Sequence, residues 1–337
     1  MSRSVFPGPV LVMGAGSIGC YLGGALAGAG AEVSFVGRAR VLAALREHGL
    51  TVTDLDGGRV ELAASLLRLE ERVPTSARPS LVLLTVKSGA TAAAAAELGA
   101  VLPAGTLVLS MQNGVSNAAV ASSAATSLRV LPGMVPYNVA ELGPGHFHRG
   151  TTGYLAAQDD LELRDWAVAF EHAGLPLTLH ADLRAIQWGK LLLNLNNPVN
   201  ALSGLPLRDE LLVRGYRQCL AALIDESRGV LAAAGIEPAA VGAVKPAMLS
   251  LLLRLPTPLF RIVAARMLRI DPKARSSMAD DLALGRPTEI DALCGAVVEL
   301  AHERGGDAPL NRRMVDLLKA APGALTARQL KEQLGVV

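Results

Sequence analysis

The sequence predicts an N-terminal α/β domain with a mostly parallel sheet, followed by an all-α domain. In the N-terminal part, short apolar runs alternate with helical segments, the order typical of parallel strands joined by crossover helices. From near Ala181 the pattern is helical, with apolar residues at three- and four-residue spacing. A chain of 337 residues is long enough for two domains, and we place them at residues 1–181 and 182–337.

Composition describes a compact globular protein and excludes several classes of partner. Apolar residues make up 51% of the chain and charged residues 18%, which excludes a disordered protein. The net charge is +2 and there is no long basic run, so no nucleic-acid-binding face is indicated. The three cysteines are far apart and form no Cys-x-x-Cys pair, which favours buried thiols in a reducing cytoplasm and neither a disulfide framework nor a metal site.

Two apolar stretches bear on membranes. Residues 10–31 follow Arg3 and could pass for a signal peptide, but their spaced glycines and the strand that follows fit the start of an α/β domain better. Residues 248–268 are interrupted by two prolines and three arginines, and lack the roughly 20 uninterrupted apolar residues that a membrane span requires. We expect short, bent helices over residues 242–271, no membrane association and a cytoplasmic location.

A glycine-rich turn begins the α/β domain. Residues 10–13 predict a buried strand and the Ala/Leu-rich stretch after residue 19 predicts a helix; between them stands Gly14-Ala15-Gly16-Ser17-Ile18-Gly19. In this pattern the first glycine permits a tight turn, the second lets the backbone approach a pyrophosphate, and the third lets the helix pack closely on the strand. The phosphates would lie at the positive end of the helix. We therefore expect these six residues to bind a dinucleotide in a Rossmann-like unit, although glycine-rich turns also occur without a ligand.

The end of the second strand bears on the identity of the dinucleotide. The strand over residues 31–36 ends at Gly37-Arg38, and no acidic residue stands there to accept a hydrogen bond from the ribose 2′-hydroxyl of NAD. An arginine suits the 2′-phosphate of NADP, so we expect NADPH as the cofactor. A solvated surface arginine is the alternative.

Two later strands end in polar side chains. Lys87 follows the strand over residues 80–86 and Asn113 follows the strand over residues 107–110. Ligands of open α/β sheets lie beyond the carboxyl ends of the strands, so we expect both residues where cofactor and substrate meet. A surface lysine and an Asn-Gly turn are the alternatives.

A hairpin is predicted between the strand over residues 31–36 and the strand over residues 80–86. Alternating segments at residues 50–54 and 59–63 flank a Gly-Gly turn there, and we expect this hairpin to be peripheral.

A polar stripe follows near the start of the helical domain. Lys190, Asn194 and Asn197 stand at i, i+4 and i+7, which places all three on one face of a helix. Such a stripe could face a cleft, with the lysine supplying a proton and the amides holding substrate oxygens. The alternative is a lysine that reaches water and asparagines that cap their neighbours. Pro198 removes an N–H and clashes with the carbonyl of residue 194, so we expect the helix to bend.

A third polar stretch lies further along the helical domain. Ser277-x-x-Asp280 matches a capping box, so Ser277 could be only a helix cap. Pro287 fits the first turn of a new helix, with Glu289 near its positive end. Compensation of the helix dipole is the alternative role for Glu289.

The chain resembles the ketopantoate reductase (2-dehydropantoate 2-reductase) family over nearly its whole length. The resemblance is carried by the turn of residues 14–19, Gln112-Asn113-Gly114, Lys190-x-x-x-Asn194, and Ser276-Ser277-Met278 with Thr288-Glu289-Ile290-Asp291. The last two motifs together discriminate against other dehydrogenases that contain Lys-x-x-x-Asn. The resemblance implies NADPH-dependent reduction of 2-dehydropantoate to pantoate, in pantothenate and coenzyme A biosynthesis.

The resemblance also implies roles for single residues. Lys190 is similar to the family's proton donor, and Glu289 lies at the cofactor–substrate junction and would orient lysine and ligand. The implied substrate contacts are Asn113, Asn194, Asn197 and Ser277. The implied cofactor contacts are Gly14, Ala15, Gly16, Ser17, Ile18, Gly19, Arg38, Lys87, Asn113, Val139 and Glu289.

Two departures from the family pattern leave the substrate open. Many members have a second asparagine eight residues after the lysine, where this chain has Pro198, with Asn197 one place earlier. Another substrate-side asparagine of some members is Leu207 here. The alternatives are a reductase of the same architecture acting on another 2-keto or hydroxy acid and, from a different class, a non-catalytic NADP-binding protein. The sequence also leaves a homodimer open.

Overall fold

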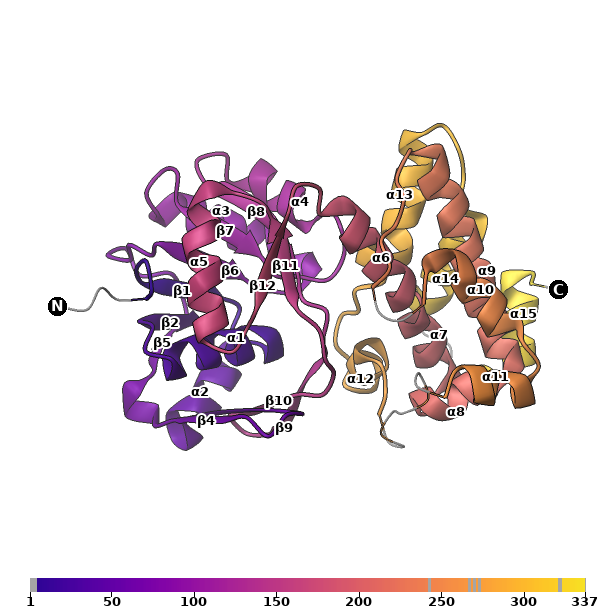
Figure 1. The fold of residues 1–337 in the computed structure, drawn as a ribbon, viewed down its shortest axis with the longest axis horizontal. Helices are drawn as coiled ribbons and strands as arrows, with labels where there is room; N and C mark the ends of the chain where they lie inside the picture. The colour runs from indigo at the N-terminus through magenta and orange to yellow at the C-terminus, as the bar shows by residue number, and fades with distance from the viewer. Residues whose placement is uncertain are drawn as a thin grey trace. The chain divides into compact units, whose positions relative to one another are not determined.

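The computed structural model describes residues 5–241, 244–265, 268, 271, 274–320 and 323–336. The chain divides into two compact units, residues 1–183 and 184–337, which are drawn in Figure 1. The first is an α/β unit with a mostly parallel sheet and the second is helical, so the predicted fold class is confirmed. Within the described residues, no helix has both the length and the apolar character needed to cross a membrane.

The first unit is built on an eight-stranded sheet with the strand order β12-β11-β8-β7-β6-β1-β2-β5. All neighbouring strands are parallel except β8 and β11, which are antiparallel. The strands are β1 (Val10–Met13), β2 (Val33–Val36), β5 (Arg68–Glu70), β6 (Leu81–Leu84), β7 (Leu107–Ser110), β8 (Arg129–Met134), β11 (Leu155–Gln158) and β12 (Leu177–His180).

Helices cover both faces of this sheet (Figure 1). Val10 and Val12 belong to one apolar core, shared with α1 (Ser17–Gly28), α2 (Ala39–His48) and α5 (Leu161–His172). Leu11 and Met13 belong to a second core, shared with α3 (Thr91–Val101) and α4 (Asn117–Ala124). Because successive strand residues face opposite sides and both sides are covered, the central strands β1 and β6 are continuous apolar runs, whereas the edge strand β5 is mostly exposed.

A second, four-stranded sheet corrects one expectation. The predicted hairpin forms as β3 (Leu50–Asp54) and β4 (Arg59–Leu62), but it is not peripheral. β3 also pairs in parallel with β10 (His146–Arg149), which pairs with β9 (Val139–Gly143). Val52 and Phe147 are buried in the core that contains α1, so this sheet contributes to the main fold of the unit.

Glycines let α1 pack closely against both sheets. A Cβ on Gly23 would lie 2.5 Å from the ring of Phe35 in the large sheet, and a Cβ on Gly28 would lie 2.3 Å from the Val60 side chain in the small sheet. Contacts that short are not tolerated, so larger residues would push the helix away from a sheet. The helix that follows the glycine-rich turn is therefore the centre of the unit.

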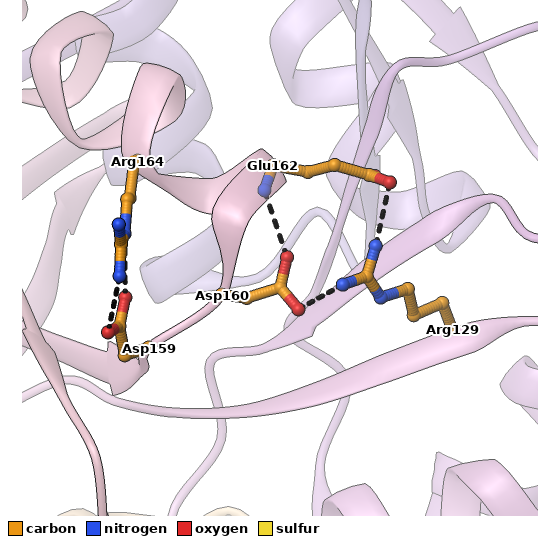
Figure 2. Close-up of polar contacts among 5 residues, drawn as sticks. All are labelled: Arg129, Asp159, Asp160, Glu162 and Arg164. Carbon is orange, nitrogen blue, oxygen red and sulfur yellow. Dashed lines mark hydrogen bonds and ion pairs between the residues drawn. The ribbon is translucent and has the colours of Figure 1, made fainter.

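Charged side chains fix the start of α5, as Figure 2 shows. The Asp160 carboxylate accepts the backbone N–H of Glu162 at 3.0 Å and forms an ion pair with Arg129 at the start of β8. Arg129 also contacts the Glu162 carboxylate at 2.7 Å, and Arg164 pairs with Asp159 at 2.9 Å. Exposed pairs such as Arg164–Asp159 contribute little to stability, and the Asp160 carboxylate is partly buried, so these contacts set the position of the start of α5 relative to β8.

The second unit surrounds one long helix, α9 (Arg214–Ala233), in which Cys219, Leu223 and Ile224 are fully buried. The Glu226 carboxylate on α9 accepts two backbone N–H groups of the first turn of α14 (Pro309–Lys319), both at 2.8 Å. The predicted short helices between residues 242 and 271 are present as α10 and α11, while residues 242, 243, 266, 267, 269 and 270 lie outside the described residues. The other helices are α6 (Arg184–Asn194), α7 (Asn196–Ser203), α8 (Leu207–Leu212), α10 (Pro246–Arg254), α11 (Thr257–Val263), α12 (Ser277–Ala283), α13 (Ala296–Glu303), α14 (Pro309–Lys319) and α15 (Ala327–Leu334).

Candidate active site

Two glycines of the turn are required by the fold itself. Gly14 has φ of +117°, and a Cβ there would lie 2.6 Å from the backbone nitrogen of Val86 at the end of β6. A Cβ on Gly19 would lie 2.2 Å from the carbonyl oxygen of Gly14. The N–H groups of Gly14 and Ala15 both donate to the carbonyl of Val36 at 2.9 Å, which joins the turn to the end of β2. The tight turn and the close helix–strand packing predicted for these glycines are therefore present.

Gly16 differs, because its surroundings leave room for a side chain. It stands at the N-cap of α1, and apart from its neighbours along the chain, no atom of the described residues lies within 4 Å of the position that its Cβ would occupy. The first turn of α1 carries no acidic side chain that would repel an anion. Open space above positive N–H groups is what a pyrophosphate needs, so Gly16, Ser17 and Ile18 fit the phosphates of a dinucleotide.

The predicted cofactor residues outside the turn lie on three elements. Arg38 is exposed at the N-cap of α2, two residues after β2, and its side chain makes no hydrogen bond or ion pair within the described part of the chain. Lys87 is exposed and follows β6. Val139 is half-buried at the start of β9, in the small sheet.

A buried polar network, which the sequence analysis missed, holds the ends of β6 and β7 together. The Gln112 amide donates to the carbonyl of Val86 at 2.8 Å and to the Thr91 hydroxyl at 2.7 Å. Thr91 donates to the Asn117 side chain at 2.9 Å, and Asn117 donates to the carbonyl of Asn113 at 2.5 Å. The backbone of Asn113 is thus fixed by its neighbours. The sequence signal that could have revealed this network is the Gln112 amide, together with several hydroxyl side chains that stand near an apolar strand.

In the second unit, the polar stripe lies on two helices rather than one. Lys190 and Asn194 are on α6, whereas Asn197 lies in the first turn of α7; all three are half-buried. The break falls at Leu195, three residues before Pro198. Pro198 has no N–H to donate to the carbonyl of residue 194, and its ring crowds that carbonyl, which gives the predicted bend its physical cause.

The environment of Lys190 perturbs its protonation. Burial lowers the pKa of Lys190 from 10.5 to about 8, and the nearby Glu289 carboxylate opposes this by favouring the charged amine. The preceding residue, Gly189, lets α6 approach its neighbour, because a Cβ there would lie 2.1 Å from the carbonyl oxygen of Ala239. The second unit therefore holds an amine that can gain or lose a proton near neutral pH.

One alternative and one expectation around the third polar stretch are wrong. Ser276, not Ser277, caps α12, because its extended backbone lets its hydroxyl accept the N–H of Ala279 at 3.1 Å. Ser277 is the exposed first residue of α12, and no hydrogen bond of its hydroxyl is found within the described residues. Pro287 does not open a helix: helical structure begins at Ile290, after Glu289, whose carbonyl accepts the N–H of Ala292 at 3.1 Å.

Further chemistry is limited by what surrounds the remaining candidates. Leu207 begins α8 and presents an apolar, half-buried side chain. The three cysteines are buried, and burial raises the pKa of each thiol, so they are poor nucleophiles. Across the described ranges, no group of three His, Cys, Asp or Glu side chains is placed to hold a metal ion. The chemically distinctive features are the open N-terminus of α1 and the perturbed Lys190.

Both units of the chain match one known protein family. Residues 10–159 match the family "Ketopantoate reductase PanE/ApbA" and residues 182–321 match its C-terminal counterpart. The chain is 32% identical over 327 residues to the 2-dehydropantoate 2-reductase of Halobacterium salinarum, a match that covers 93% of this chain and 98% of that protein.

Solved structures agree with these matches. A PanE/ApbA family ketopantoate reductase from Ralstonia eutropha JMP134 is 29% identical with a TM-score of 0.77, over 97% of this chain and 99% of that one. D-mandelate dehydrogenase, solved with NADH and anilino(oxo)acetate, shares the fold at 20% identity with a TM-score of 0.75, over 98% of this chain and 100% of that one. The chain therefore belongs to the ketopantoate reductase PanE/ApbA family of oxidoreductases.

Proposed function

We propose that the protein reduces the carbonyl group of a 2-keto acid with NADPH, and that 2-dehydropantoate is its substrate. The observation that carries this proposal is the Lys190 amine, whose pKa of about 8 leaves it charged yet able to release a proton near neutral pH. Family membership and the activity named for the Halobacterium salinarum relative support the choice of substrate.

The protein's own residues supply the proton that the carbonyl oxygen receives, and they orient the substrate. NADPH, when bound, supplies the hydride that adds to the carbonyl carbon. Lys190 donates a proton to the carbonyl oxygen, and its charge stabilises that oxygen as negative charge develops there. Glu289 keeps Lys190 charged by raising its pKa against burial. We assign hydrogen bonds to the substrate oxygens to Asn113, Asn194, Asn197 and Ser277.

Arg38 supports NADPH over NADH. Its unpaired, exposed guanidinium follows β2, where an NAD-specific protein carries an acidic residue. The choice is a real one in this fold, since D-mandelate dehydrogenase was solved with NADH. Arg38→Ala is expected to raise the KM for NADPH about tenfold or more, the equivalent of one charged contact of about 1.5–3 kcal/mol, with little effect on the KM for NADH. Equal effects on both cofactors would remove Arg38 from this role.

The activity is tested by measuring kcat/KM for 2-dehydropantoate and a panel of other 2-keto acids, with NADPH and with NADH. Lys190→Ala is expected to lower kcat by about 10²–10⁴-fold, the usual contribution of a positioned acid. Glu303→Gln, which removes an exposed carboxylate, is the control and should leave kcat unchanged. Normal turnover by Lys190→Ala would refute the mechanism.

A second candidate is a reductase of another 2-keto acid, and Leu207 favours it. An apolar side chain at the position where some family members have a substrate-side asparagine suits a substrate with an apolar group there. A panel in which 2-dehydropantoate is a poor substrate and an apolar 2-keto acid a good one would establish this alternative. Tight NADPH binding with no turnover of any keto acid would instead indicate a non-catalytic binding protein.

A further inference from the structure

A buried carboxyl group in the second unit lacks a partner that its chemistry demands. Glu210 on α8 is fully buried, and its Oε2 accepts a hydrogen bond from the Asn196 amide on α7 at 3.1 Å. Its Oε1 has no hydrogen-bond partner, and neither does the Oδ1 of Asn196, although both atoms are buried. Two acceptor atoms of one interacting pair are thus left without a donor.

Among the described residues, no cation forms an ion pair with Glu210, although the charge of Arg217 acts on it from a distance. Arg217 on the adjacent helix α9 is fully buried, but its guanidinium donates to the carbonyls of Leu211, Leu253 and Leu255 at 2.8–3.0 Å. It also lies over the ring of Phe260, 4.1 Å from the ring centre. Within the described residues Glu210 makes no ion pair. An ionised Glu210 would be a buried charge with one hydrogen bond, which is strongly unfavourable.

The other titratable groups around Glu210 do not supply a charge. On α9, Tyr216 and Cys219 both have raised pKa values, chiefly because of burial, and stay neutral. α7 carries no titratable side chain, and Arg208 and Asp209 on α8 are exposed. Burial raises the pKa of Glu210 to about 8, against the Asn196 hydrogen bond and the Arg217 charge, which both lower it.

We propose that Glu210 is held as a neutral carboxylic acid and forms a ring of two hydrogen bonds with the Asn196 side-chain amide. Asn196 Nδ2 donates to Glu210 Oε2, as observed, and the protonated Oε1 donates to Asn196 Oδ1. One proton therefore satisfies both unpartnered atoms at once, because a carboxylic acid and an amide each offer one donor and one acceptor on adjacent atoms. The pair joins the first residue of α7 to α8.

This pair positions residues that lie next to it in the structure. α7 holds the start of α12 in two ways: the carbonyl of Asn197 accepts the Ser276 hydroxyl at 3.1 Å, and the Asn200 side chain accepts the Ser276 N–H at 2.9 Å. Ser276 in turn caps α12, whose first residue is Ser277. Glu210 is thus a positioning residue for Asn197 and Ser277, and its protonation can be measured whatever the substrate is.

The proton makes folding depend on pH with a defined sign. A glutamate has an ordinary pKa of 4.5, and Glu210 in the folded protein has a pKa of about 8, so the folded state binds one more proton between these values. The stability that Glu210 contributes is complete below the lower value and is lost as the pH rises to the upper one. Through this group, the folding equilibrium constant falls about tenfold per pH unit in that window.

The test compares urea unfolding of wild type, Glu210→Gln and Glu303→Gln from about pH 5 to about pH 9. Glutamine keeps both hydrogen bonds of the ring without a titratable proton. The ratio of the wild-type folding constant to that of Glu210→Gln should fall about tenfold per unit up to about pH 8 and then level off. Glu303→Gln, at an exposed site, should run parallel to wild type. Parallel curves for wild type and Glu210→Gln would overturn the proposal.

Two further measurements keep the proposal testable if Glu210→Gln does not fold. The carboxyl resonance of isotope-labelled Glu210 in wild type should be that of a protonated acid at neutral pH, and an ionised signal there would refute the neutral pair. Asn196→Ala should speed hydrogen exchange at the amides of Ser276 and Ala279. Unchanged exchange at both amides would refute the positioning role.

Discussion

Replacing Glu289 with glutamine removes the negative charge that opposes the effect of burial on Lys190. Burial brings the pKa of Lys190 from 10.5 to about 8, a net change worth about 3 kcal/mol at about 1.4 kcal/mol per unit. An opposite charge within about 4–6 Å typically shifts a pKa by about one to three units. In the Glu289→Gln variant, the pKa of Lys190 should therefore fall to about 7 or lower. Lys190 can donate a proton only while charged, so activity is kept below this pKa and lost as the pH rises through it.

The size of the effect follows from the charged fraction of Lys190. Near pH 7.5, about three quarters of the amine is charged with a pKa of about 8, and about one quarter with a pKa of about 7. Proton supply alone should therefore lower turnover about threefold or more at that pH, and much less near pH 6.

The assay is the pH profile of kcat, followed by loss of the NADPH absorbance with 2-dehydropantoate at saturation. The midpoint of the alkaline limb, not the absolute rate, is the readout, because Glu289 is also assigned to the cofactor–substrate junction. Glu303→Gln should keep the wild-type midpoint. A Glu289→Gln midpoint equal to or above that of wild type would refute the reasoning.

The remaining predictions concern stability and assembly. Lys190→Met should lower kcat by about 10²–10⁴-fold. It should nevertheless raise the free energy of unfolding near pH 7 by about 1–3 kcal/mol, because the folded protein no longer buries a charged amine. This gain should shrink from pH 8 to pH 10.5, because the wild-type lysine loses its proton in the folded state first. Gly189→Ala would place a Cβ 2.1 Å from a backbone carbonyl oxygen, so it should lower the free energy of unfolding by about 1–3 kcal/mol. The control is Gly229→Ala in α9, where the space around the glycine is open. It should be neutral or stabilise the protein by up to about 1 kcal/mol in the same urea titration. Leu251 on α10 and Ile262 on α11 are 60% and 75% exposed and could form a homodimer interface. In that case, the double variant Leu251→Asp with Ile262→Asp should have the sedimentation coefficient of a monomer. An unchanged dimer would place the interface elsewhere.

In the large sheet, the exposed edge strand β5 was not predicted, whereas the central strands β1, β6 and β7 were predictable because they are buried on both faces. Such strands are continuous apolar runs, and the glycines beside them have fixed geometric roles. β9 and β10 were missed for the opposite reason: no residue of β9 is buried, and β10 is mostly polar, with Phe147 as its one buried residue. Their pairing with β3 depends on contacts between distant parts of the chain, which local patterns do not encode.

The residue types of the candidate site were also visible in the sequence, but their physical state was not. Lys190 and Glu289 are far apart in the chain, so neither the burial of the lysine nor its carboxylate neighbour could be inferred from spacing. The choice of cap on α12 was ambiguous for a local reason. Ser276 and Ser277 are adjacent, and only the backbone decides which one caps; Ser276 is extended while Ser277 is already helical.

The break between α6 and α7 changes how the position of Asn197 bears on the substrate. On a continuous helix, a shift of one residue would rotate the side chain by about 100° away from the direction of the family's second asparagine. Here the helix ends at Asn194 and restarts at Asn196, so the direction of Asn197 is set by the packing of α7 and not by its spacing from Lys190. The one-residue shift is therefore no argument against a substrate contact by Asn197. Of the two departures from the family pattern, the apolar Leu207 is the one that bears on substrate choice.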